Sequence, residues 1–152
     1  MKFVIYILLL FVQNGINNIV AQHIPEEVRI KQYVNANYKG AEPRMSGLYV
    51  IKTKESHGKP AVPGKNVRVH YEGCFLNNNV FDSSYKRNKP ITFRLGSGRV
   101  IAGWEEGLSI LKEGETAVFI IPSYLACGDR QVGPVPPDTP LVFKIELLKV
   151  DE

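Results

Sequence analysis

Cysteine and clustered charge are both scarce in this sequence. Only Cys74 and Cys127 occur among the 152 residues, which excludes a small domain held together by several disulfides. Their positions leave open whether the two thiols pair. The net charge is +4, and no run of five or six like charges is present. We therefore expect no nucleic-acid partner, because nucleic-acid binding needs basic residues concentrated on one surface.

Motifs of common enzyme classes are also missing. Residues 96–101 begin like a glycine-rich dinucleotide loop, but Ile101 stands where the third glycine belongs. No G-x-S-x-G motif occurs, and the three histidines lack the spacing of metal ligands. A nucleophilic pair of Cys127 and His70 is conceivable, although a lone cysteine and histidine are more often structural. The sequence thus gives no indication of a metal or a cofactor.

One long hydrophobic run is present, close to the N-terminus. It covers residues 3–12 after Lys2 and is shorter than the roughly 20 apolar residues that cross a bilayer. Asparagines follow it, and Ala21 is a small residue before a cleavage point at Gln22. The pattern predicts a secretion signal at 1–21 and an exported protein, in a bacterial periplasm, at a cell surface or in a secretory pathway. An uncleaved membrane anchor is the alternative.

Residues 22–45 are interpreted as an N-terminal extension with a helix over 24–38. Pro25 suits the first turn of a helix, and Glu26 and Glu27 favour its positive N-terminal end. The apolar stripe of this helix is thin. We therefore expect a weakly held, solvated extension or linker rather than a helix that binds a partner.

From residue 46 onward the pattern changes to strands around one short helix. Apolar and polar residues alternate over 67–72, which is typical of a half-buried strand. Trp104, Leu108 and Leu111 recur at helical spacing and predict a short helix over 103–111. The other strands are expected at 48–53, 81–83, 91–95, 116–121 and 141–147.

The balance of these elements predicts the fold class. A single short helix is too little to connect five or six parallel strands. We therefore predict an α+β fold, in which the helix covers the apolar face of a twisted antiparallel sheet of five to six strands. The stretch at 116–121 is apolar on both faces and should be a central strand.

Large apolar side chains gather at the ends of the expected elements, with the carboxylate of Asp82 among them. On the residues alone, the aromatics could be ordinary core and Asp82 could cap a turn with Ser83. The apolar cluster consists of Tyr71, Phe81, Val100, Ile101, Trp104 and Phe143.

Glu105 and Glu106 are consecutive on the expected helix, so their side chains diverge and do not form a carboxylate pair.

Several consecutive motifs resemble the FKBP-type peptidyl-prolyl cis-trans isomerase family. The similarity runs in unbroken order over about residues 46–150, within an expected domain at 46–152. It implies a peptidyl-prolyl cis-trans isomerase that needs no cofactor and acts on proline-containing polypeptides. Macrolides such as tacrolimus or rapamycin are further ligands implied by the resemblance, and we expect a monomer. The motifs are VRVHYEG at 67–73, VFDSS at 80–84, RNKP at 87–90, FRLG at 93–96, VIAGWEEGL at 100–108, PP at 136–137 and LVFKIELL at 141–148.

The resemblance also implies a role for each site residue. Trp104 matches the floor on which the proline ring rests, and Asp82 matches a carboxylate near the substrate carbonyl. Arg87 matches the residue that orients this carboxylate and a tyrosine, and the backbone N–H of Ile101 matches a donor to a substrate carbonyl. The wall positions are Tyr71, Phe81, Val100, Ile101 and Phe143.

This sequence departs from the family pattern at three places. Cys127 replaces a tyrosine whose hydroxyl helps to hold the ligand, and a thiol is a weaker donor. Ile91 stands where an aromatic residue is common, and the loop at 128–135 differs from familiar versions. Tyr124 is a candidate to compensate for the missing hydroxyl. An alternative function is a chaperone that binds proline-containing segments with weak or no isomerase activity.

Overall fold

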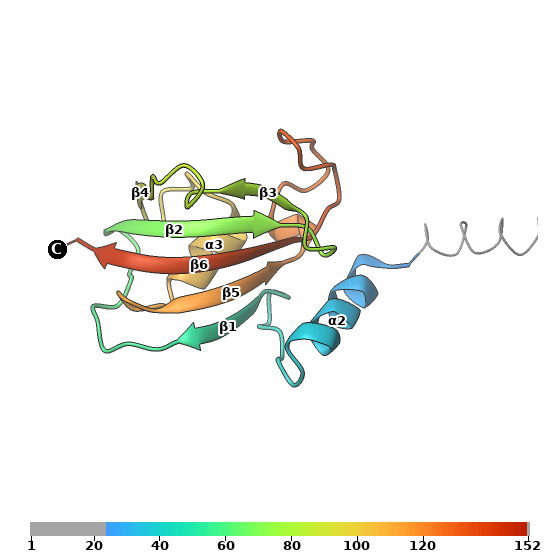
Figure 1. Cartoon of the computed structure of the whole chain (residues 1–152), viewed down its shortest axis with the longest axis horizontal. Helices are drawn as coiled ribbons and strands as arrows, with labels where there is room; N and C mark the ends of the chain where they lie inside the picture. The colour runs from blue at the N-terminus through green and yellow to red at the C-terminus, as the bar shows by residue number, and fades with distance from the viewer. Residues whose placement is uncertain (1–23, 152) are drawn as a thin grey trace, which may run out of the picture.

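The computed structural model describes residues 24–151 of the chain (Figure 1). The predicted secretion signal at 1–21 lies outside these residues. Within 24–151, no helix combines the length and the apolar content that a membrane crossing needs. The elements, in chain order, are α2 (Glu26–Asn37), β1 (Tyr49–Lys54), β2 (Asn66–Cys74), β3 (Val80–Ser83), β4 (Ile91–Arg94), α3 (Ala102–Leu108), β5 (Thr116–Ile121), the 3₁₀ turn η1 (Ser123–Leu125) and β6 (Leu141–Val150).

The strands form one six-stranded antiparallel sheet in the order β1-β5-β6-β2-β3, with β4 also paired to β2. The long strands β6 and β2 lie side by side through the middle of the sheet (Figure 1). The predicted α+β fold is confirmed, and the apolar stretch at 116–121 is the interior strand β5.

The inner face of the sheet packs on α3. Along β2, Val69 and Tyr71 are buried on this face, while His70 between them points to the other side. Glycine lets α3 approach the sheet closely, because a Cβ added at Gly107 would lie 2.5 Å from the ring of Phe119. We refer to the side chains buried between α3 and the sheet as the inner cluster; its members include Val69, Tyr71, Trp104, Phe119 and Phe143.

The helix α3 ends at Leu108, three residues earlier than the spacing predicts. The amide of Ile110 bonds to the carbonyl of Gly107, and that of Leu111 bonds to the carbonyl of Leu108. These are bonds to the third residue back, so the last turn tightens instead of continuing as an α-helix. Leu111 is nevertheless buried in the inner cluster, which explains why its position fitted the helical pattern.

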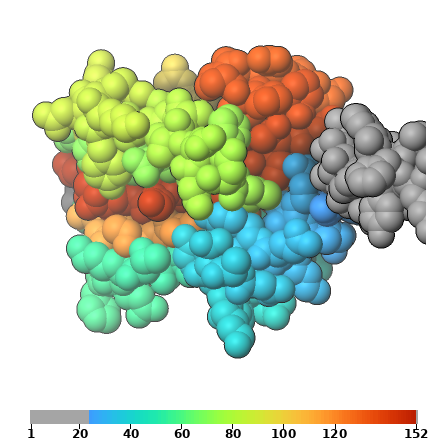
Figure 2. Space-filling view, turned by 45° about the vertical axis from the view of Figure 1, so that its right-hand side comes forward, coloured from blue at the N-terminus to red at the C-terminus, as the bar shows by residue number. Residues whose placement is uncertain are grey.

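Part of the outer face of the sheet is covered by α2, which corrects the expectation of a solvated extension. Ile30 and Val34 are buried against an apolar patch of the sheet, here called the outer cluster. The helix also lies beside the turn between β2 and β3 (Figure 2), where the hydroxyl of Tyr33 donates to Asn78 at 3.2 Å. The sheet residues of the outer cluster are Tyr49, Cys74, Val118, Ile120 and Val142.

Ile30 and Val34, with Tyr33 packed beside them, can hold α2 because the sheet itself is apolar beneath them. Val118 and Ile120 of β5 face the outer side, whereas Ala117, Phe119 and Ile121 face α3. A strand that is apolar on both faces needs a cover on each of them. The sequence therefore held a signal for the docking of α2, but in β5 rather than in the helix.

The two cysteines lie on opposite faces of the sheet. Cys74 is buried in the outer cluster, and Cys127 packs against the inner cluster. Both thiols are free. The pairing that the sequence left open is therefore absent from the structure.

Candidate active site

Trp104 of α3 lies at the centre of an aromatic group on the inner face. Its ring meets that of Tyr71 at a centroid distance of 5.1 Å and that of Phe143 at 5.2 Å, both nearly edge to face. Such arrangements are the favoured ones for aromatic pairs. The three residues come from α3, β2 and β6, so the group joins the helix to the middle of the sheet.

Phe81 extends this group along the sheet. Its ring stands edge-on to Phe143 at 5.7 Å and leans against Phe75 at 5.0 Å. Gly73 makes room for the contact, because a Cβ there would lie 2.7 Å from both Phe81 and Phe143. Phe75 did not feature among the expected site residues. Phe75 lies one residue beyond the end of β2 and continues the period-two alternation of Tyr71 and Gly73, which was its signal in the sequence.

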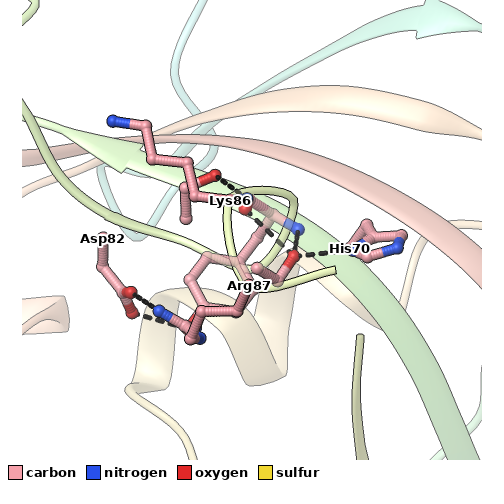
Figure 3. A network of polar contacts seen from close by, with 7 residues as sticks. His70, Asp82, Lys86 and Arg87 are labelled. Atoms are coloured by element: carbon pink, nitrogen blue, oxygen red, sulfur yellow. Dashed lines mark hydrogen bonds and ion pairs between the residues drawn. The ribbon is translucent and has the colours of Figure 1, made fainter. Parts of the chain in front are cut away.

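A polar trio lies at one edge of the aromatic group. The hydroxyl of Tyr71 donates to Oδ2 of Asp82 at 2.6 Å, and Nη2 of Arg87 donates to the Tyr71 oxygen at 2.8 Å. The other terminal nitrogen of Arg87 pairs with Oδ1 of Asp82 (Figure 3). Each member therefore contacts the other two. The Tyr71 ring is buried, whereas the Asp82 and Arg87 side chains are 37% and 48% exposed.

Strand pairing explains how Arg87 reaches Tyr71. β4 pairs with the first half of β2 and β3 with the second half, so the loop between β3 and β4 passes beside the middle of β2. Ser84 fastens this loop, since its amide donates to the Tyr71 carbonyl at 2.9 Å and its hydroxyl accepts from the Tyr71 amide at 2.7 Å. Asn88 adopts a positive φ of 48°, which turns the chain toward β4. The role of Ser84 was not expected from the sequence.

The trio fixes the charge state of its members. Partial burial would raise the pKa of the Asp82 carboxyl, but hydrogen bonds from Arg87 and Tyr71 outweigh it and hold the pKa below its ordinary value. Burial, reinforced by the neighbouring carboxylate, raises the pKa of the Tyr71 phenol. At neutral pH Asp82 is therefore ionised and Tyr71 keeps its proton as a donor.

The other expected wall residues lie around the same cluster. Val100, Ile101 and Ile91 are half-buried and pack against the inner cluster. Ile101 is the residue before α3, with an extended ψ of 151°. Within 24–151, its amide donates no hydrogen bond to another residue, so this N–H is available to an incoming acceptor.

Cys127 and Tyr124 lie in different places, although they are three residues apart. Cys127 packs against the inner cluster, as its position predicts. Tyr124 is 66% exposed and directs its hydroxyl away from that cluster, to the carbonyl of Ser46 at 2.6 Å. The structure therefore does not bring Tyr124 to the site, and it cannot supply the hydroxyl that Cys127 lacks.

Trp104 carries an unusual polar atom. Its Nε1 is buried and has no hydrogen-bond partner among the described residues. Buried donors almost always have a partner, and an unmade bond costs about 1–3 kcal/mol.

The arrangement excludes a Cys127–His70 nucleophile. His70 lies on the outer side of β2, where it bonds Ser84 at 2.8 Å and stacks on Tyr85 at 4.4 Å. Cys127 belongs to the inner face. In the described part of the chain, no group of three or more metal-ligating side chains comes together.

Glu105 and Glu106 diverge, as their adjacency on a helix predicts. Glu105 accepts hydrogen bonds from the amides of Gly96 and Gly98 and so anchors the loop before α3. Glu106 forms an ion pair with Arg44 at 2.6 Å. Both carboxylates therefore have structural partners outside the aromatic group.

Comparisons with known proteins match this geometry to one family. The family model of FKBP-type peptidyl-prolyl cis-trans isomerases matches residues 57–148. An FK506-binding protein of Neisseria meningitidis serogroup B is 46% identical over 109 residues, which cover 71% of this chain and 100% of that protein. The isomerase FkpA of Buchnera aphidicola is 36% identical over 127 residues, which cover 84% of this chain and 51% of that protein.

Solved structures give the same result. The crystal structure of FkpA from Escherichia coli superposes with a TM-score of 0.74 at 34% identity, covering 91% of this chain and 64% of that one. The crystal structure of AtFKBP13 superposes with a TM-score of 0.69 at 36% identity, covering 73% of this chain and 98% of that one. This chain therefore belongs to the FKBP-type peptidyl-prolyl cis-trans isomerase family, an enzyme family whose sheet, helix and aromatic motifs it carries.

Proposed function

We propose that this protein accelerates the cis–trans isomerisation of X–Pro bonds in exported polypeptides as they fold, with the inner-face aromatic group as its active site. The observation that carries the proposal is the trio of Tyr71, Asp82 and Arg87 fixed at the edge of the rings around Trp104. Uncatalysed X–Pro isomerisation takes about tens to hundreds of seconds, which is slow enough to limit folding.

The chemistry suits a site without a nucleophile. Rotation about a peptide bond costs about 18–20 kcal/mol because it breaks amide resonance. The twisted amide has less charge separation than the planar one, so apolar surroundings favour the transition state over the ground state. Each tenfold acceleration requires about 1.4 kcal/mol of such preferential stabilisation.

Each residue has a role in this scheme. The indole of Trp104 supports the proline ring, and Phe81 and Phe143 exclude water from the imide. The free amide of Ile101 donates to a substrate carbonyl next to the proline. Asp82, ionised and held by Arg87, faces the carbonyl that rotates, where its fixed charge acts on the changing amide dipole. Macrolides such as tacrolimus are proposed to compete for the same surface.

A second candidate function is a chaperone that holds proline-containing segments with little turnover. Cys127 favours it, because a thiol replaces a hydroxyl donor beside the inner cluster. Binding by the aromatic group would survive this exchange, whereas the orientation of the carbonyl would weaken. The two functions differ in one measurable quantity, which is the rate of isomerisation per bound peptide.

The export part of the proposal rests on residues 1–21. Their basic start, short apolar run and Ala21 are typical of a cleaved secretion signal. Mass spectrometry of the protein recovered after export tests this, and we expect a mature N-terminus at Gln22. A chain that keeps Met1 would contradict cleavage and favour the membrane-anchored form.

The isomerase proposal is tested by kcat/KM for a short X–Pro peptide, measured with the full chain. We expect clear acceleration by the wild type, a loss of about tenfold in Asp82→Ala, and a larger loss in Trp104→Ala. Melting temperatures of each variant separate a loss of the site from a loss of the fold. A wild-type rate equal to the uncatalysed rate, with peptide binding intact, would favour the chaperone.

A further inference from the structure

The loop that follows β5 is tied at its start to the N-terminal extension. A carboxylate oxygen of Glu26, the first residue of α2, accepts a hydrogen bond from the backbone N–H of Ser123 at 2.7 Å. The next residue, Tyr124, donates its hydroxyl to the carbonyl of Ser46 at 2.6 Å. Both anchors, Glu26 and Ser46, precede residue 57, where the match to the family model begins.

The anchored residue is connected to the proposed active site through the backbone. The carbonyl of Ser123 accepts from the amides of Ala126 and Gly128, both at 2.9 Å. Between them lies Cys127, which packs against the inner cluster together with Leu125 and Ala126. A shift of Ser123 would therefore move the wall residue Cys127 with it.

Packing at this junction is interrupted on one side by a groove. A groove of about 610 Å³ lies between the start of α2, the segment around residues 43–47 and η1, and Glu26, Ser123 and Tyr124 are among its lining residues. On its other side the loop is held by packing, since Ser123 is 8% exposed and the residues at 125–127 lie against the inner cluster. The two hydrogen bonds therefore supply the restraint on the side that faces the groove.

Glu26 can act as a fixed anchor because α2 itself is held firmly. Ile30 and Val34 are buried at 4% and 2% exposure in the outer cluster. Tyr33 adds a hydrogen bond to Asn78 in the turn after β2. The helix therefore connects its docking on the outer face to a loop that borders the inner one (Figure 1).

We propose that Glu26 is a positioning residue for the isomerase site. Its carboxylate holds the amide of Ser123 and thereby sets the position of Cys127 beside the aromatic group. This inference rests on the proposed function, since Cys127 is taken there as part of the proline-binding wall. The proposal thus gives α2 a part in substrate binding, although this helix lies outside residues 57–148, which match the family model.

Three full-length variants test the role of Glu26. Glu26→Ala removes the acceptor, and Glu26→Gln keeps an acceptor oxygen without the charge. Glu27→Ala is the matched control, since it removes the same charge from an exposed neighbour in the same turn. We expect Glu26→Ala to lower kcat/KM by about three- to tenfold through a higher KM, with Glu26→Gln within about twofold of wild type.

The thiol of Cys127 gives a second readout that does not depend on turnover. Iodoacetamide modification, assigned by peptide mass, reports on Cys127, while the buried Cys74 serves as an internal reference. We expect Cys127 to react about three- to tenfold faster in Glu26→Ala than in wild type, with Glu27→Ala unchanged. Tyr124→Phe removes the second anchor with little change in shape and should act in the same direction.

The outcomes separate this inference from the proposed function. If the wild type isomerises the peptide and Glu26→Ala alters neither KM nor the Cys127 rate, the positioning role is wrong and the isomerase stands. A faster Cys127 reaction with unchanged KM would also contradict it, because the loop would then move without consequence for the substrate. If neither the wild type nor any variant isomerises the peptide, the proposed function fails. The thiol modification rates alone then decide whether Glu26 holds the loop.

Discussion

The two faces of the sheet each carry a tyrosine bonded to a carboxylate, yet only one of them resembles an active site. On the inner face Tyr71 bonds Asp82 at 2.6 Å, and on the outer face Tyr85 bonds Glu146 at 2.8 Å. Burial and the adjacent carboxylate raise the pKa of both phenols, that of Tyr85 to about 12. The two pairs therefore share a tyrosine–carboxylate bond, while Arg87 contacts both members of the inner pair only.

The surroundings distinguish the pairs. Tyr71 is 8% exposed and touches the rings of Trp104 and Phe143, whereas Tyr85 is 47% exposed and stacks on His70. On the inner face, an ionised carboxylate thus stands beside a large apolar surface. A polar group has more influence on a substrate where water is excluded. The comparison indicates that a tyrosine–carboxylate pair alone does not make a candidate site, and that the aromatic group beside the trio distinguishes the inner face.

The largest expected effect concerns the stability provided by the outer face. Val34→Ala should lower the free energy of unfolding by about 1.5–3 kcal/mol, because it leaves a cavity beneath α2. Val28 lies on the same helix and is 43% exposed, so Val28→Ala should cost less than about 0.5 kcal/mol. Urea unfolding measures both values.

The Val34 variant also tests how strongly docking at this end of α2 affects the site. Val34 lies about two turns from Glu26, and Ile30 still docks the turn between them. The loss of kcat/KM in the folded variant should therefore stay below that of Glu26→Ala. Equal stabilities for the two valine variants would show that α2 does not dock as described. A loss of kcat/KM in folded Val34→Ala as large as that in Glu26→Ala would mean that docking of the whole helix, rather than the Glu26 bond, affects the site.

The second effect compares the tyrosines directly. Tyr71→Phe removes the hydroxyl that both Asp82 and Arg87 contact, and we expect kcat/KM to fall by about five- to tenfold. Tyr85→Phe makes the same chemical change on the outer face and should stay within about twofold of wild type. Similar losses in both variants would mean that the hydroxyls act through stability and not through the site.

The smallest effect is expected in acid. The folded protein lowers the pKa of Asp82 below its ordinary value of 3.8, so the stability gained from its ionised form is complete above that value. This gain is lost as the pH falls through the lower folded-state pKa. We expect kcat/KM to be flat from about pH 5 to about pH 8 with respect to this group, and to fall only below about pH 4.

A pH profile of kcat/KM measures this effect, with circular dichroism at each pH to confirm folding. Asp82→Asn provides the control, since it should be weaker at all pH values and lack the acid limb assigned to this carboxyl. An acid limb above about pH 5 that disappears in Asp82→Asn would contradict the lowered pKa.

The inner face could be predicted from the sequence to a large extent. The alternation along β2 predicted a sheet strand and the face on which each of its side chains lies. The helical spacing of Trp104 and Leu108 predicted the helix α3 that packs on the sheet. The contact between Arg87 and Tyr71 came from the resemblance to the family, because it depends on two strands pairing with one partner. Local periodicity does not contain such long-range pairing.

The outer face was harder to predict. The stripe of α2 is only two buried residues wide, and the partner surface is supplied by β1, β2, β5 and β6. Tyr124 was misplaced for a related reason, since its three-residue distance from Cys127 suggested a shared site. The 3₁₀ turn over Ser123–Leu125 and the bend at Ala126, with φ −112° and ψ −117°, lie between the two residues, and neither was visible in the sequence pattern.

Exchange NMR of a proline peptide, with the full chain present in small amounts, tests the central claim most directly. The rate of exchange between the cis and trans peptide signals would be followed together with the indole N–H signal of Trp104, the single tryptophan of the chain. We predict accelerated exchange and a shift of this indole signal at the same peptide concentrations. Accelerated exchange with an undisturbed indole, or no acceleration while the indole shifts, would contradict an active site built on Trp104.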